Sequence, residues 1–286
     1  MHPVILKLGP LTFHSYGVMI AISFAIGTVL AVRRADSRGI PGEKITDLAL
    51  VVLVSSLIGA RILYVIPHWP DFAGEPLGVV RIWEGGLTLY GGVILAVLAS
   101  YAFVRRQRLP WAKVADSVAV PLALGLGIAR IGCFLNGCCH GRPTSGSLGI
   151  VFPEGSVAGD AFPGAAVLPT QLLESAFGFV LLGTIHLIEN SKPRDGVSIL
   201  VVLVGYGAFR FLLDFARFYE EGMIVTVGGA PLSVNQIVSL VGVAGGVLGF
   251  LRIRGARPGS GAASDTGAGG AASGASVDVG AAGRRA

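Results

Sequence analysis

Charged side chains are scarce in this sequence. Only 14% of its 286 residues are Asp, Glu, Lys or Arg, against roughly a quarter in soluble globular domains. The hydrophobic share is 52% and the mean hydropathy is +0.72. A chain with so few polar groups cannot cover its core in water, so the composition excludes an ordinary soluble domain and indicates a membrane protein.

Cysteine is also rare, and the three cysteines fall in one segment, at positions 133, 138 and 139. So few cysteines exclude a disulfide-rich secreted domain. Glycine follows no three-residue period and apolar residues are frequent, which excludes collagen-like and wholly disordered chains. In a membrane protein, an excess of Lys and Arg usually reflects the orientation of the spans. The net charge of +5 is therefore no sign of nucleic-acid binding, and we predict no nucleic-acid partner.

Apolar runs long enough to cross about 30 Å of hydrocarbon occur seven times. They lie near 11–32, 47–66, 87–104, 114–131, 170–188, 197–215 and 233–251. We therefore predict an all-α polytopic membrane protein with seven transmembrane helices. Its membrane domain covers 1–254, and a Gly- and Ala-rich disordered tail covers 255–286.

Basic residues predict the orientation of these runs. Outside the runs, 15 Lys and Arg residues fall on one side of the membrane and four on the other. Because cytoplasmic segments carry the excess of Lys and Arg, we predict an external N-terminus and a cytoplasmic C-terminus. The first run has no basic leader and no small-residue cleavage site, so we expect it to be retained.

Polar residues inside the runs gather at one depth. Arg61, Arg130 and Arg210 each lie near the outer end of a run that leads outward, and ionised residues within a span generally pair or face a wet cavity. The inward-leading runs carry polar residues near their beginnings, namely His14, Tyr16, Tyr90, Gln171 and Glu174. Any one of these residues could also anchor a helix at the membrane interface. Anchoring residues would occur at both interfaces, however, whereas this set lies at only one. We expect a functional polar layer at the external leaflet.

Two arginines at head-group depth suit a phosphate, because the guanidinium fork donates bidentate hydrogen bonds and stays charged. A phospholipid substrate is therefore expected. Gly91 and Gly92, beside Tyr90, fit either a close approach of the lipid or close packing of helices.

The segment ARIGCFLNGCCHGRPT, residues 129–144, holds all three cysteines. Zinc sites usually pair ligands two to four residues apart and complete a set of four, whereas only His140 is near here. We therefore predict no metal and no cofactor. An acyl-carrying thiol, a redox pair, a disulfide from Cys133 to Cys138 or Cys139, and inert buried thiols stay open.

Several motifs together resemble the bacterial phosphatidylglycerol–prolipoprotein diacylglyceryl transferase family over about 10–252. They are HSYG (14–17), GARILYV (59–65), WEGGLTLYGG (83–92), ARIGCFLNGCCHGR (129–142), PTQLLES (169–175), YGAFRFLLDFAR (206–217) and LSVNQIVSL (232–240). The resemblance implies transfer of the diacylglyceryl group of phosphatidylglycerol to the lipobox cysteine of a prolipoprotein, in the bacterial cytoplasmic membrane. The implied partners are phosphatidylglycerol, prolipoprotein signal peptides and the lipid bilayer.

The resemblance also implies site residues. Arg130 matches an arginine that binds phosphatidylglycerol, and Arg210 matches a second essential arginine. Together with the polar residues near the external leaflet, these matches predict a catalytic set of Arg130, Arg210, Tyr90 and Tyr16. The predicted phosphatidylglycerol-binding set is Arg130, Arg210, Asn136, Gly141, Gln171, Glu174 and Arg61. Arg217 also occupies a family motif position.

The chain departs from the family pattern at several of its motif positions. Tyr90 stands where many members carry histidine, Cys133 where the signature usually has asparagine, and Cys138 where it usually has glutamate. Asp214 replaces glutamate, and Leu168 stands where histidine is common. Two alternatives therefore stay open: a paralogue that acts on another phospholipid or thiol, with the cysteines taking part, and a non-catalytic lipid-binding membrane protein.

Overall fold

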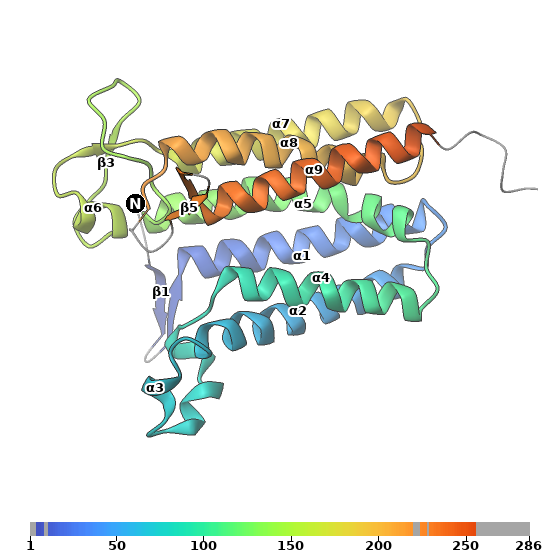
Figure 1. Ribbon diagram of the computed structural model, residues 1–286. Coiled ribbons are helices and arrows are strands. Elements are labelled where there is room, and N and C mark those ends of the chain that lie inside the picture. Colours follow the sequence, from blue (N-terminus) through green and yellow to red (C-terminus); the bar gives the residue numbers. More distant parts are fainter. Residues whose placement is uncertain (1–3, 9–10, 220–223, 228, 256–286) are drawn as a thin grey trace, which may run out of the picture.

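The computed structural model describes residues 4–8, 11–219, 224–227 and 229–255. Within them, long helices lie side by side in one bundle (Figure 1). They are α1 (Ser15–Asp36), α2 (Gly42–Val65), α4 (Leu89–Arg106), α5 (Trp111–Asn136), α7 (Thr170–Asn190), α8 (Val197–Leu213) and α9 (Val234–Gly255). All seven are long and apolar enough to cross a membrane, α8 being extended through η3 (Asp214–Ala216). The prediction of seven spans is confirmed, and the chain is a multi-pass membrane protein.

Three short sheets correct the expectation of an all-α chain. Each is an antiparallel pair of strands: β1 (Val4–Leu8) with β2 (Leu11–His14), β3 (Ile150–Val151) with β4 (Ala166–Val167), and β5 (Ile224–Val227) with β6 (Ala230–Ser233). Residues 11–14, predicted as the start of the first span, belong to β2 instead. Their alternation of apolar and polar side chains has the period of a strand, and α1 begins only at Ser15.

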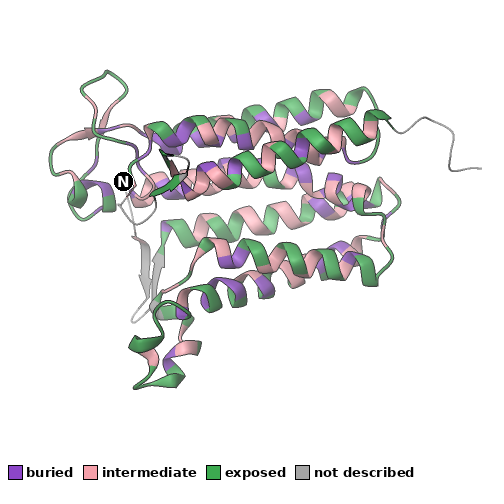
Figure 2. Ribbon diagram, in the orientation of Figure 1, coloured by how far each residue is buried: buried purple, intermediate pink, exposed green. Residues whose placement is uncertain are grey.

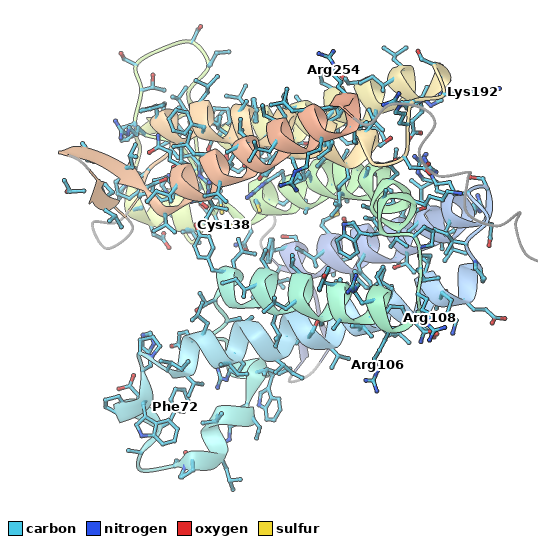
Figure 3. All side chains as sticks on the ribbon, turned by 45° about the vertical axis from the view of Figure 1, so that its right-hand side comes forward. Phe72, Arg106, Arg108, Cys138, Lys192 and Arg254 are labelled. Carbon is cyan, nitrogen blue, oxygen red and sulfur yellow. The ribbon has the colours of Figure 1, made fainter. Side chains whose placement is uncertain are left out.

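The connections at the two ends of the bundle differ. The β pairs and the short helices α3 (Trp69–Phe72), η1 (Pro76–Val80), η2 (Ile82–Glu84) and α6 (Val157–Ala161) lie at one end (Figure 1). At the opposite end the connections are short and basic, and Arg106, Arg108, Lys192 and Arg254 lie there, away from Cys138 (Figure 3). The predicted tail, 255–286, lies outside the described residues except for Gly255, which ends α9.

Pairs of helices pack through small residues. α1 lies along α5, α2 along α4, α5 along α7, and α8 along α9. At the α2–α4 crossing, a Cβ added to Gly91 would lie 2.2 Å from the carbonyl oxygen of Gly59, and a Cβ on Gly59 would lie 2.3 Å from that of Gly91. These two glycines therefore allow the helix backbones to touch, so helix packing, not approach of a lipid, explains Gly91.

The fourth span is one continuous helix although Pro121 lies inside it. Proline removes one helical hydrogen bond, which membrane helices tolerate. The helix ends at Asn136, and the next residue, Gly137, has a left-handed φ of 73° that reverses the chain. Large apolar side chains such as Leu50, Val97 and Val241 are exposed along the outer faces of the bundle, as a lipid-facing surface requires (Figure 2).

Candidate active site

One carboxylate lies at the centre of the polar end of the bundle. Glu174 is on the second turn of α7, and its side chain is 1% exposed. Its Oε1 lies 3.0 Å from Nη2 of Arg130 on α5 and 4.0 Å from Nε of Arg210 on α8, and its Oε2 lies 3.7 Å from Nη1 of Arg217. The hydroxyl of Tyr206 donates to Oε1 over 2.7 Å. Three helices and the segment after α8 therefore meet at one buried anion.

A second carboxylate holds the other side of Arg210. Asp214 is buried, and its Oδ1 lies 2.9 Å from Nη1 of Arg210, one helical turn earlier. Tyr219 joins the two: its hydroxyl accepts from Nη2 of Arg210 over 2.7 Å and donates to Oδ1 of Asp214 over 2.5 Å. Ser233 donates to the other oxygen of Asp214. Burial raises the pKa of Tyr219, so its hydroxyl stays protonated and continues to donate at neutral pH.

The network reaches α4 through the start of α9. Nδ2 of Asn235 donates to the hydroxyl of Tyr219 over 2.8 Å, and Oδ1 of Asn235 accepts from the hydroxyl of Tyr90 over 2.7 Å. A continuous series of hydrogen bonds and ion pairs thus runs from Tyr90 on α4 to Arg130 on α5. The structure brings these two residues, both predicted to be catalytic, into one polar network.

The segment after α5 is held against the start of α7. Nε2 of Gln171 donates to the carbonyl oxygen of Cys138 over 2.8 Å, and the backbone N–H of Gly141 donates to the carbonyl of Leu168 over 2.8 Å. A Cβ on Gly141 would lie 2.7 Å from the Cβ of Leu168, so the chain passes here only without a side chain. Oε1 of Gln171 is buried and has no hydrogen-bond partner among the described residues.

Tyr16 and Asn136 border the network. Tyr16 lies where α1 crosses α5, since a Cβ on Gly132 would lie 3.4 Å from its Cα. Tyr16 is 42% exposed. Asn136 is the last residue of α5, and its side chain interacts with the thiol of Cys138. Both predicted residues therefore lie at the last two turns of α5, the helix that carries Arg130.

The three cysteines, separated by up to six positions in sequence, converge in space. Their sulfur atoms all lie within 4.8 Å of one another, and all three thiols are free. Nη1 of Arg130 donates to Sγ of Cys133 over 3.7 Å, which joins the thiols to the arginine cluster. The sequence left an acyl-carrying thiol, a redox pair, a disulfide and inert thiols open, and the structure places the three thiols in one group with no disulfide between them.

Comparison with known proteins shows which family the chain belongs to. Residues 3–252 match the family described as prolipoprotein diacylglyceryl transferase. The chain belongs to this family. It is 35% identical over 243 residues to the phosphatidylglycerol–prolipoprotein diacylglyceryl transferase of Bordetella bronchiseptica, which covers 83% of this chain and 90% of the relative.

Two further relatives of this transferase family come from different bacteria. The Halalkalibacterium halodurans protein of the same name is 32% identical over 247 residues, covering 86% of this chain and 84% of the relative. Phosphatidylglycerol–prolipoprotein diacylglyceryl transferase 2 of Clostridium perfringens is 30% identical over 248 residues, covering 87% and 94%. The match therefore extends over most of both chains in each comparison.

Arg61 was also predicted to bind the phosphate, but its hydrogen bonds are made outside the network around Glu174. Its Nε donates to the carbonyl of Val79 over 2.8 Å, and its Nη2 to that of Gly78 over 2.7 Å. Its Nη1 donates to Gly85 and Gly86 over 2.7 and 2.9 Å. Four of its five N–H groups are thus used to fasten residues 78–86 to α2, and these contacts support a structural role, not the phosphate-binding role predicted for it.

Replacing Arg61 with Gln is expected to loosen this segment. Hydrogen bonds from a charged donor each contribute about 1.5–3 kcal/mol, so amide hydrogen exchange in 76–88 is expected to accelerate by more than about 100-fold. Arg142→Gln is the control, because Nε of Arg142 donates to the carbonyl of Arg217 in another loop. Unchanged exchange in 76–88 of the Arg61 variant would contradict the structural role.

Four residues of the network were not predicted from the sequence. Tyr206 lies within the motif YGAFRFLLDFAR, Tyr219 lies just beyond the sixth run, and Ser233 and Asn235 lie at the start of the seventh. The depth rule that selected Tyr90 and Glu174 applies equally to the seventh run and would have found Asn235. Arg217 was counted as a loop residue, yet its side chain is 7% exposed and directed at the buried anion.

Proposed function

We propose that this chain transfers the diacylglyceryl group of phosphatidylglycerol to the thiol of a prolipoprotein's lipobox cysteine. The sulfur forms a thioether with the diacylglyceryl carbon, the bond from that carbon to the phosphate oxygen breaks, and glycerol phosphate leaves. The thiol proton is released as the thioether forms and is taken up by the phosphate of the departing glycerol phosphate. Membership of the transferase family supports the reaction, and the arginine cluster at the polar end is the observation that carries it.

The phosphate of the lipid is proposed to bind at Arg130 and Arg210. Three guanidinium groups surround only two carboxylates here, and the side chain of Arg130 is the most exposed of the three at 17%, against 7% for Arg210. Arg130 therefore offers donors on the open side of the cluster. A guanidinium that is already oriented stabilises the charge that develops on a departing phosphate without reorganising.

The remaining predicted residues are proposed to position the lipid and the thiol. Oε1 of Gln171, buried and unpaired among the described residues, suits a hydroxyl of the glycerol head group, since it can only accept. Asn136 and Gly141 shape the segment beside it. The hydroxyl of Tyr90, oriented by Asn235, and that of Tyr16 are proposed to contact the reacting sulfur or phosphate. Glu174 holds the arginines apart and oriented.

The polar end of the bundle is proposed to face the outside of the bacterial cytoplasmic membrane, with the N-terminus outside and the C-terminus in the cytoplasm. The basic connections at the opposite end support this orientation (Figure 3). The network then lies at the depth of the head groups of the outer leaflet, where phosphatidylglycerol and a translocated signal peptide are both accessible.

Complementation tests the proposed reaction. A bacterium depleted of its own transferase is expected to accumulate unmodified prolipoprotein, and expression of this chain is expected to restore the thioether-linked form, measured by mass spectrometry of a reporter lipoprotein. Purified chain mixed with phosphatidylglycerol vesicles and a lipobox peptide is expected to give the same product. Good expression with neither product would contradict the assignment and favour a lipid-binding protein without this activity.

A further inference from the structure

The backbone after α5 turns the three cysteines toward one point. Cys133 is in the last turn of the helix, and Gly137 reverses the chain so that the N–H of Cys138 donates to the carbonyl of Cys133 over 3.1 Å. Cys139 has a left-handed φ of 61°, which is uncommon for a residue with a side chain. Thr170 donates to the carbonyl of Cys139 over 3.0 Å and holds this conformation from α7.

The resulting group of sulfur atoms has nearly the size of a metal site. Metal–thiolate bonds of about 2.3 Å place the sulfurs around one tetrahedral ion about 3.8 Å apart. Here the three sulfurs lie within 4.8 Å of one another, so small side-chain rotations bring them to bonding distance. No other His, Cys, Asp or Glu of the described residues joins this group.

His140, although adjacent in sequence, is engaged elsewhere. Its ring stacks on Phe218, with centroids 5.7 Å apart and an interplanar angle of 13°, and its Nδ1 lies 3.0 Å from the carbonyl oxygen of Gly141. Three sulfur ligands with one position left open are thus what this chain offers, and such a soft ligand set favours Zn²⁺ or a similar thiophilic ion.

The charges around the thiols also suit an ion. Nη1 of Arg130 lies 3.7 Å from Sγ of Cys133. Three thiolates around one divalent ion carry a net charge of about −1, which the neighbouring guanidinium group offsets.

We propose that Cys133, Cys138 and Cys139 bind one Zn²⁺ ion through three thiolates, beside the phosphate-binding arginines. The convergence of the three sulfurs carries this proposal, which replaces the expectation of no metal drawn from ligand spacing alone. It does not depend on the proposed transfer reaction, because three thiols and their surroundings are sufficient to bind the ion.

Metal titration of the full-length chain tests the proposal. Reduced, metal-free protein in detergent is titrated with Co²⁺, and a thiolate-to-cobalt charge-transfer band is expected to saturate at one equivalent and to disappear when Zn²⁺ is added. Each of Cys133→Ser, Cys138→Ser and Cys139→Ser is expected to weaken Co²⁺ binding by more than about 100-fold, beyond the effect of changing an outer-shell partner. Cys→Ala variants with unchanged melting temperatures separate loss of a ligand from misfolding.

Two histidine variants serve as controls for the titration. His140→Gln and the exposed His68→Ala are expected to keep one equivalent and the full band. Absence of the band while all three thiols react with a thiol reagent would overturn the proposal. So would retention of full affinity by any cysteine variant, or isolation of the chain with a Cys133–Cys138 disulfide and no metal. Because the readout is spectroscopic, loss of lipid transfer in the complementation assay leaves this test unaffected.

Discussion

Replacing Arg130 or Arg210 with Gln is expected to reduce diacylglyceryl transfer by at least about 100-fold, the loss seen when one oriented donor to a developing anion is removed. Both side chains contact Glu174, and both are proposed to bind the phosphate that departs. Gln keeps a polar side chain but removes the charge and the fork. Initial rates of transfer to a lipobox peptide, measured over a range of phosphatidylglycerol concentrations, give the effect.

Lysine variants separate charge from geometry at these two positions. Arg130→Lys keeps the charge but loses the planar pair of donors, so activity is expected to stay well below that of the unchanged chain. Arg106→Gln, at the opposite end of the bundle, is the matched control and is expected to keep full activity (Figure 3). Near-normal transfer by both glutamine variants would remove the phosphate-binding role proposed for the cluster.

Depth in the membrane was predictable from the sequence because it depends only on the position of a residue within an apolar run. It placed Arg130, Arg210 and Glu174 at one level, and the structure joins all three in one network. Depth does not give the direction in which a side chain points around the helix. Arg61 lies at the same level but turns toward the carbonyls of 78–86, so the rule could not separate it from the cluster.

Other features depend on backbone conformation and on pairs distant in sequence. The convergence of the three sulfurs requires the left-handed residues Gly137 and Cys139, which no spacing rule contains. The β3–β4 pair joins strands across the segment 152–165, so no tight-turn signal marked it. By contrast, the helix through Pro121 was recoverable, because hydrophobicity over the whole run outweighs the loss of one hydrogen bond.

Replacing Glu174 with Gln is expected to destabilise the fold by about 3–5 kcal/mol, because removing one partner of a buried ion pair leaves the others uncompensated. Here three guanidinium groups lose their shared anion while the size of the side chain is unchanged. The melting temperature in detergent measures the lost stability. Adding phosphatidylglycerol is expected to raise the melting temperature of the variant more than that of the unchanged chain, because its phosphate supplies the missing negative charge to the same arginines.

Glu189→Gln is the matched control for the Glu174 variant, since Glu189 pairs with Arg34 and Arg38 at the opposite end of the bundle. It is expected to lower stability without specific rescue by phosphatidylglycerol and without loss of transfer per folded molecule. Equal rescue of both variants would mean that the lipid stabilises the bundle generally and does not bind at the arginines around Glu174. A Glu174 variant as stable as the unchanged chain would show that this carboxylate does not hold the cluster together.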